Sequence, residues 1–294
     1  MMAYCTCGIS GKERVKVMKK LLALMLGVAV CASVTACGSS ESSTTASNGA
    51  STSSAGEAAD SSEASGTETK HFTIATDTAF RPFEYTNADG EFEGIDVDIL
   101  AAIAEDQGFT YDLNSLGWDA SIAACQAGQA DGMIAGASIT DERKENGWLF
   151  SDGYYNATQS VAVASSSSAS GFEDLKGTTV AVKTGTQGAA YAESVKDEYG
   201  FDISYFEDSP TMYQAVIGGQ CSGCFEDTPI MKAYIAQDGI DLKVLDSTEN
   251  EGSPYGFAVF SADKQELLDL FNAGLADIKA NGKYDEIIAK YLGE

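Results

Sequence analysis

Histidine is almost absent from this 294-residue sequence, which contains only His71. No second imidazole exists to build a Ser-His-Asp or Cys-His constellation, and a metal site made of several histidines is excluded. The composition therefore rules out the commonest hydrolytic mechanisms. We interpret His71 as a solvated residue beside a strand, and we expect no catalytic residue, no metal and no cofactor.

Positive charge is also scarce, with 18 Lys and Arg against 44 Asp and Glu and a net charge of −26. Residues 1–36 carry five of the basic residues and one acidic residue, so removing them leaves 13 against 43 and a charge of −30. A surface this acidic repels phosphate backbones and anionic lipid. We therefore expect no nucleic-acid partner and no peripheral membrane binding by charge.

Long hydrophobic runs are missing. The apolar run at residues 21–34 follows Lys19 and Lys20, and its fourteen residues are too few to cross a bilayer as a helix. This pattern predicts a secretory signal peptide over residues 1–36, with residues 1–17 as an upstream extension. The run ends in Val34-Thr35-Ala36-Cys37, which resembles the bacterial lipoprotein processing box. We expect lipidation at Cys37 and anchoring to the outer face of the cell membrane; an ordinary signal peptide with an incidental cysteine is the alternative.

Residues 38–70 are rich in Ser, Ala, Thr, Gly and Glu and contain almost no apolar bulk. Such a segment cannot bury enough surface to fold. A flexible coil of this length reaches roughly 30 Å, so we interpret residues 37–70 as the lipidated cysteine and a disordered tether.

The cysteines beyond the tether do not indicate a redox site. Cys125 follows small apolar residues and is most simply part of a core. Cys221 and Cys224 have the spacing of a redox motif, but we expect them on a strand, where residues i and i+3 face opposite sides. We assign no redox or metal role to either.

The remaining sequence alternates strand and helix patterns. Predicted strands cover residues 72–76, 109–114 and 131–136, separated by a helix over 96–107 with Asp96 as N-cap and by a short helix capped by Asp119. A second unit of the same kind begins at Thr178 and runs to Asp227, and two helical stripes lie on either side of Gly282. This order predicts parallel sheets with helices on their faces.

Two stretches look like connectors between these units, residues 160–164 and residues 255–260. A chain that enters a second lobe and returns has two crossings, hence a hinge. We predict one lobe from residues 71–160 plus 256–294 and another from residues 161–255. Because ligands bind beyond the carboxyl ends of strands in such sheets, we expect both lobes to face a shared cleft.

A series of motifs occurs in order over residues 72–293, and they are ATDTAFRPFEY at 75–85, GIDVD at 94–98, GASITDER at 136–143, FSDGYY at 150–155, DLKG at 174–177, VAVKTGT at 180–186, YG at 255–256 and NGKY at 281–284. Together they resemble the bacterial extracellular solute-binding proteins of family 3, and within that family the glutamine-binding proteins. The resemblance implies an α/β, two-lobed periplasmic-binding-protein fold of type II. Each lobe would be a mainly parallel sheet flanked by helices, and a two-strand hinge would join the lobes.

The family's ligand residues map onto this sequence position by position. Arg143 matches the arginine that grips the ligand α-carboxylate, and its guanidinium can form two parallel charge-assisted hydrogen bonds. Ser138 and the Gly136 carbonyl match groups that contact the carboxylate and the ammonium. Asp227 matches the second-lobe carboxylate that pairs with the ammonium.

Other mapped positions would enclose the ligand and choose its side chain. Phe80 and Trp118 match aromatic walls, although each residue type is more often plain core. Free N–H groups at Thr186 and Gln187, before a helix, suit a carboxylate. Side-chain choice is implied for three residues, Asp77, Lys183 and Glu226. Close glutamine-binding relatives carry histidine at the position of Glu226, which keeps other ligands open.

The resemblance therefore implies a monomeric, non-enzymatic protein that captures an amino acid by hinge closure and delivers it to an ABC permease. Glutamine is the favoured ligand, while arginine, lysine, histidine and cystine remain alternatives. Two other functions stay open. One is a cyclohexadienyl-type dehydratase on the same fold, with Glu226 as general acid. The other is a ligand-sensing module that signals through a separate partner.

Overall fold

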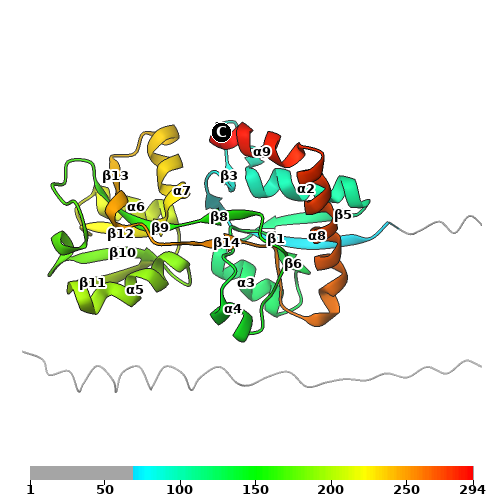
Figure 1. Cartoon of the computed structure of the whole chain (residues 1–294), viewed down its shortest axis with the longest axis horizontal. Coiled ribbons are helices and arrows are strands. Elements are labelled where there is room, and N and C mark those ends of the chain that lie inside the picture. The colour runs from blue at the N-terminus through cyan, green and yellow to red at the C-terminus, as the bar shows by residue number, and fades with distance from the viewer. Residues whose placement is uncertain (1–68, 294) are drawn as a thin grey trace, which may run out of the picture. The chain divides into compact units, whose positions relative to one another are not determined.

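The structure is a computed structural model that describes residues 69–293. The predicted signal peptide, the predicted lipidation site Cys37 and all but the end of the predicted tether lie outside these residues. Between residues 69 and 293, no helix combines the length and apolar character that crossing a membrane requires. Figure 1 shows two groups of strands and helices, which we call the first lobe (around β1) and the second lobe (around β10).

The first lobe is built on a five-stranded sheet with the order β5-β1-β6-β15-β7. β1 is parallel to β5 and β6, whereas β15 is antiparallel to β6 and β7. A small antiparallel sheet of β2, β3 and β4 follows β1. The strands are β1 (His71–Thr76), β2 (Ala79–Phe80), β3 (Glu84–Thr86), β4 (Phe92–Glu93), β5 (Thr110–Ser115), β6 (Gly132–Met133), β7 (Leu149–Phe150) and β15 (Ala258–Val259).

Helices cover both faces of this sheet. On one face, α2 packs against α8 and α9, and Ile99, Ile103 and Phe271 are fully buried there. On the other, Trp118 of α3 packs with Trp148. The elements are α2 (Ile95–Gln107), α3 (Trp118–Gln126), α4 (Asp141–Glu145), α8 (Gln265–Ala280), α9 (Lys283–Leu292) and the 3-10 turn η4 (Ala262–Lys264).

The second lobe repeats the design with the strand order β11-β10-β12-β9-β13. β10 is parallel to β11 and β12, while β9 is antiparallel to β12 and β13. Its strands are β9 (Gln159–Ala164), β10 (Thr179–Lys183), β11 (Asp202–Phe206), β12 (Gly223–Asp227) and β13 (Leu242–Leu245). Its helices are α5 (Gln187–Tyr199), α6 (Ser209–Ile217), α7 (Thr228–Ala233), the π-helix η2 (Tyr234–Asp238) and the 3-10 turns η1 (Phe172–Leu175) and η3 (Asp246–Thr248).

Two paired strands run between the sheets. β8 (Tyr155–Ala157) and β14 (Ser253–Tyr255) are antiparallel partners and cross the middle of Figure 1. The prediction that residues 160–164 and 255–260 serve as connectors was therefore wrong for most of their length. Residues 159–164 are an inner strand of the second sheet, and residues 258–259 are an inner strand of the first.

Most predicted elements are present, but two helix starts differ. α2 begins at Ile95 with Gly94 as N-cap, so Asp96 is buried rather than capping. Gly94 has φ 146°, and a side chain there would overlap the Phe83 carbonyl. α3 likewise begins at Trp118 after Gly117, without a side-chain cap from Asp119.

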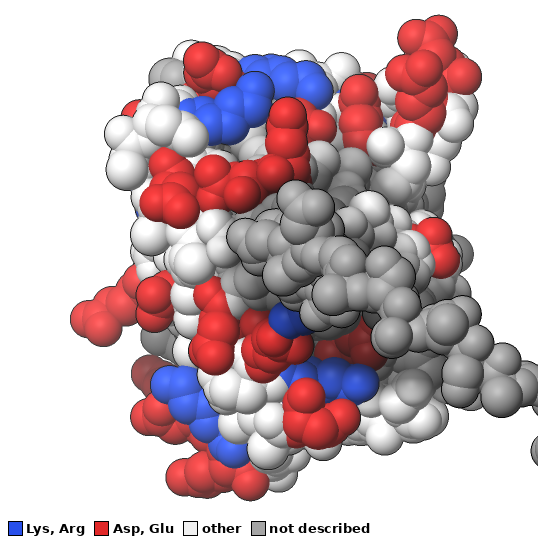
Figure 2. All heavy atoms as spheres, turned by 90° about the vertical axis from the view of Figure 1, so that its right-hand side faces the viewer, with Lys and Arg blue, Asp and Glu red and all other residues white. Residues whose placement is uncertain are grey.

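The described cysteines are all free and buried. Cys125 packs in the core beside α3, and Cys221 precedes β12 while Cys224 lies within it. Carboxylates dominate the exposed charge, and Figure 2 shows Asp and Glu over more of one face than Lys and Arg.

Candidate functional site

The residues predicted to contact a ligand line one nearly closed cavity, with about 10 Å³ of free space. They lie at or after the carboxyl ends of β1, β6, β10 and β12, in β2, or at the starts of helices, so both lobes contribute to the lining. A space of this size holds about one water molecule, so the lobes must move apart before a larger molecule can enter. The lining residues are Asp77, Phe80, Trp118, Ala135, Gly136, Ser138, Arg143, Lys183, Thr186, Gln187, Glu226 and Asp227.

Arg143 is held between aromatic rings and backbone carbonyls. Its guanidinium carbon lies 5.0 Å from the Trp118 ring and 5.1 Å from the Trp148 ring. It donates to the Ser138 carbonyl at 2.9 Å and to the Gly185 carbonyl, across the cleft, at 3.2 Å. Burial lowers the pKa of Arg143 to about 10, with the charge of Asp227 opposing the shift. The side chain therefore remains a fixed cation at neutral pH.

Asp227 supplies a buried anion in the same cavity. It ends β12, is 5% exposed, and accepts hydrogen bonds from Gln159 Nε2 at 2.6 Å and from the Tyr255 hydroxyl. Burial raises the pKa of Asp227, and the bonds from Tyr255 and Gln159 together with the charge of Arg143 work against that rise. Arg143 and Asp227 thus present opposite charges to one enclosed space.

A second charged pair spans the lobes. Lys183, at the end of β10, donates to Asp77 just after β1, and both side chains are almost fully buried. The other Asp77 oxygen accepts from the Thr78 amide at 2.7 Å, and Lys183 Nζ lies 5.1 Å from the centre of the Phe80 ring. Burial would lower the pKa of Lys183, but the carboxylates of Asp77 and Glu226 outweigh burial and raise it.

Glu226 forms part of the second-lobe wall and is 1% exposed. One carboxyl oxygen accepts from Ser209 Oγ at 2.6 Å and the other from the Asp227 amide at 3.1 Å. Burial and the charge of Asp227 raise the pKa of Glu226 to about 7, and Lys183 opposes this. The positive charge of Lys183 therefore partly offsets the negative charge of Glu226.

The remaining predicted residues shape the walls. Thr186 caps the thirteen-residue helix α5 by accepting from the Ala189 amide, and Gln187 is the first residue of that helix. Gly136 has φ 55°, and a methyl group there would lie 2.5 Å from the Phe80 ring. The Trp118 indole N–H is buried and has no hydrogen-bond partner within residues 69–293.

Several functional neighbours were missed from the sequence. Tyr255 and Gln159 orient Asp227, Trp148 stacks on Arg143, and Ser209 binds Glu226. Only Tyr255 lay in a recognised motif, and the motif gave it no role. Across the described part of the chain, no group of three or more His, Cys, Asp or Glu side chains is arranged to hold a metal ion.

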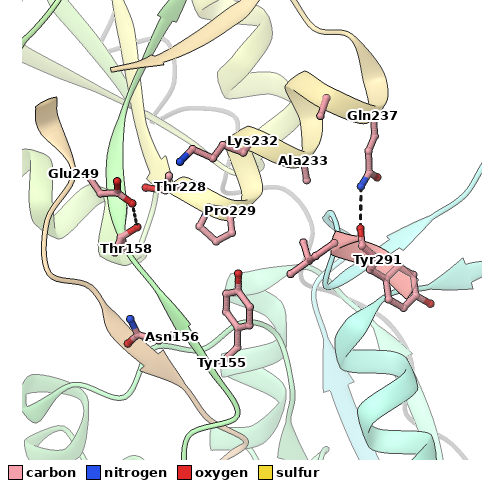
Figure 3. Close-up of a pocket in the computed structure, with 12 residues that line it drawn as sticks. Tyr155, Asn156, Thr158, Thr228, Pro229, Lys232, Ala233, Gln237, Glu249 and Tyr291 are labelled. Carbon is pink, nitrogen blue, oxygen red and sulfur yellow. Dashed lines mark hydrogen bonds between the residues drawn. The ribbon is translucent and has the colours of Figure 1, made fainter. Parts of the chain in front are cut away.

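A second hollow of about 370 Å³ lies beside the hinge, between β8, α7 and the end of α9 (Figure 3). It contains none of the predicted ligand residues. At its edge, Gln237 Nε2 donates to the Tyr291 carbonyl at 3.2 Å, as Figure 3 shows. Gln237 also accepts from Arg81, whose guanidinium lies 3.6 Å from Asp238. These contacts join the π-helix of the second lobe to the first lobe.

Several known proteins are similar to this chain over most of the described residues. The sequence profile of the bacterial extracellular solute-binding proteins, family 3, matches residues 72–294. A protein named as a probable histidine-binding protein from Neisseria gonorrhoeae is 30% identical over 229 residues, which span 76% of this chain and 84% of that protein.

Two solved structures resemble this fold. The second substrate-binding domain of GlnP from Lactococcus lactis, in an open conformation, is 38% identical with a TM-score of 0.55, over 77% of this chain and 97% of that domain. An ancestral arginine-binding protein bound to glutamine is 31% identical with a TM-score of 0.70, over 77% of this chain and all of that one. The second structure has the higher TM-score although its sequence identity is lower.

Proposed function

We propose that this chain, which belongs to family 3 of the bacterial extracellular solute-binding proteins, captures a polar amino acid for an ABC importer. The observation that carries the proposal is the enclosure of Arg143 and Asp227 in one cavity. A free amino acid is a zwitterion, and its carboxylate and ammonium are complementary to these two groups. Arg143 and Ser138 would hold the carboxylate, while Asp227 and the Gly136 carbonyl would hold the ammonium.

Glutamine is the ligand we favour, because its amide is both donor and acceptor. Its NH₂ group can donate to Asp77 while its carbonyl accepts from Lys183, so the amide enters the existing ion pair without adding charge. A cationic side chain would compete with Lys183 for Asp77 and be repelled by the ammonium. The acidity of Glu226 keeps arginine, lysine, histidine and cystine as alternatives.

Capture would proceed by hinge closure. The open cleft offers Arg143 and the aromatic walls of the first lobe, and closure then brings Lys183 and Asp227 against the ligand. Bonds such as Arg143 to the Gly185 carbonyl form only when the lobes meet. Open and closed forms present different surfaces, which allows a permease to distinguish them.

A dehydratase is the less favoured activity on this site. Glu226 has the raised pKa that a general acid needs. Its two oxygens, however, accept hydrogen bonds from Ser209 and the Asp227 amide within the second lobe. This fixed environment suits an electrostatic role better than proton delivery to a substrate, so we propose binding without chemistry.

A thermal-shift screen against the twenty amino acids, cystine and ornithine tests the proposed ligand class. A ligand at a hundred times its Kd adds about 2.7 kcal/mol to folding stability, which corresponds to a rise in Tm of about 5–10 °C for a head of this size. We expect glutamine to give the largest rise. A larger shift with arginine or lysine would replace glutamine by a basic ligand, and no shift with any of them would contradict the proposed function.

Membrane anchoring through Cys37 is a separate part of the proposal and rests on the sequence. We expect Cys37→Ser to move the protein from the membrane fraction to the soluble extracytoplasmic fraction, because one acylated residue would supply the anchor. Fractionation followed by detection of the head measures this. A Cys31→Ser variant is the matched control, and equal membrane retention of both variants would count against lipidation at Cys37.

A further inference from the structure

Two carboxyl groups lie buried behind the cavity, facing each other. Glu84 of β3 and Asp96 of α2 are both 0% exposed, and their carboxyl groups are within hydrogen-bonding reach. Neither Glu84 oxygen receives a donor from residues 69–293, and one Asp96 oxygen is likewise without one. Two buried carboxylates that face each other without a hydrogen-bond donor repel each other. A proton held between them removes one negative charge and supplies the missing donor.

Asp96 connects this pair to the ligand site and to the hinge. Its second oxygen accepts from the Gly136 amide at 2.9 Å and from the Tyr154 hydroxyl at 2.9 Å. Gly136 lines the cavity, and the chain then continues to Ser138, whose carbonyl holds Arg143. Tyr154 directly precedes the hinge strand β8. One carboxyl group therefore fixes the ligand-facing loop and the entrance to the hinge.

We propose that Glu84 is a neutral proton donor to an ionised Asp96, and that this acid pair positions the Gly136 loop for ligand binding. The proposal rests on the proposed function of the cavity. Asp96 and Glu84 are positioning residues, since neither lines the cavity. Gly136 is the residue that faces the ligand, and its N–H donates to Asp96 on the side away from the cavity.

The charged surroundings determine how the pair responds to pH. Glu84 lies within electrostatic reach of Asp77, which disfavours its ionisation, and of Lys183, which favours it. Asp96 faces Tyr154 and influences Tyr284 of α9. Burial raises the pKa of Glu84 well above its ordinary value and that of Asp96 to about 7. The pair thus holds one proton above neutral pH and a second below it.

The stability of the ligand-free protein tests the shared proton without any amino acid. A carboxyl group whose pKa is raised by folding contributes stability below its unfolded pKa, and that contribution is lost as pH rises through the folded value. We expect wild-type stability in denaturant to fall from pH 5 to pH 7. In Glu84→Gln, the amide can donate to Asp96 in place of the carboxyl proton. The slope of the unfolding free energy against pH should then be smaller, by an amount that corresponds to about one bound proton. An unchanged slope would overturn the proposal.

Ligand affinity tests the positioning role. With glutamine, or the amino acid that the thermal screen selects, we expect Glu84→Gln to bind at pH 7.5 within about threefold of wild type. Asp96→Asn should bind about tenfold more weakly, because a charged acceptor is lost. Wild-type affinity should fall as pH drops through 7, when Asp96 takes up its proton, and Asp96→Asn should lack that fall.

A Glu226→Gln control separates the other acid that titrates near neutral pH. If Asp96 is responsible, the affinity of Glu226→Gln for the amino acid should still fall as the pH drops through 7. The positioning role would be overturned if Asp96→Asn bound the amino acid as tightly as the wild type, or if Glu84→Gln bound it tenfold more weakly. If no amino acid binds the wild type, the proposed function fails together with the positioning role, while the stability slopes still decide the shared proton.

Discussion

Replacing Arg143 with alanine is expected to weaken amino-acid binding by roughly 2–5 kcal/mol, the range for removing one partner of a buried, hydrogen-bonded charge pair. The ligand carboxylate would be left in a cavity where Arg143 is only 8% exposed, without a compensating cation. Isothermal titration at pH 7.5 measures the loss. Arg143→Lys should retain part of the affinity, because an ammonium keeps the charge but not the planar pair of donors.

Arg81→Ala is the matched control for this experiment. Arg81 also joins the lobes, but its ion pair with Asp238 is partly exposed, and exposed pairs contribute about 0–1 kcal/mol. We expect a change of about fivefold or less for Arg81→Ala. A change below tenfold for Arg143→Ala would remove Arg143 from the role of carboxylate ligand.

Replacing Lys183 with methionine is expected to weaken glutamine binding by roughly 3–5 kcal/mol, the cost of leaving one member of a buried ion pair unpaired. Asp77 belongs to the first lobe and Lys183 to the second, so opening the cleft returns Asp77 to water. Removing Lys183 should therefore make cleft closure less favourable without much effect on folding. The Tm of the ligand-free protein should change much less than the affinity for glutamine. Calorimetric titration and a thermal melt of the same sample separate the two effects.

The same variant distinguishes the candidate ligands. Without the Lys183 ammonium, Asp77 and Glu226 face the ligand side chain alone, and arginine or lysine should bind more tightly than to wild type. The double variant Asp77→Asn with Lys183→Met removes both charges and should recover part of the glutamine affinity lost in Lys183→Met. Unchanged glutamine binding in Lys183→Met would contradict the proposed position of the ligand amide.

The order of elements could be read from the sequence because strand and helix periodicities are local. The partners of a strand are not local. Residues 160–164 look extended in any context, and only pairing with β12 and β13 shows that they are an inner strand of a sheet rather than a connector. Asp96 similarly follows the pattern of an N-cap, but the tight approach of Gly94 to Phe83 moves the helix start and turns the carboxyl group inward.

The cavity residues could be anticipated because they lie in motifs shared with a known family, and the structure brings all eleven of them to one cavity. Their supporting partners could not. Gln159 and Tyr255 meet Asp227 although 68 and 28 residues separate them from it in the sequence. Such contacts depend on how the two crossing strands bring the lobes together, which no local pattern encodes.

The position of β15 has a consequence for the order in which the chain can fold. β15 lies between β6 and β7 inside the first sheet, yet it comes after the whole second lobe in the sequence, and so do α8 and α9, which cover α2. The strands of the second sheet, by contrast, all lie within residues 159–245. During synthesis the second lobe can therefore fold while the first lobe still lacks β15. The first lobe begins earlier in the sequence but can be completed only after the second lobe has been made.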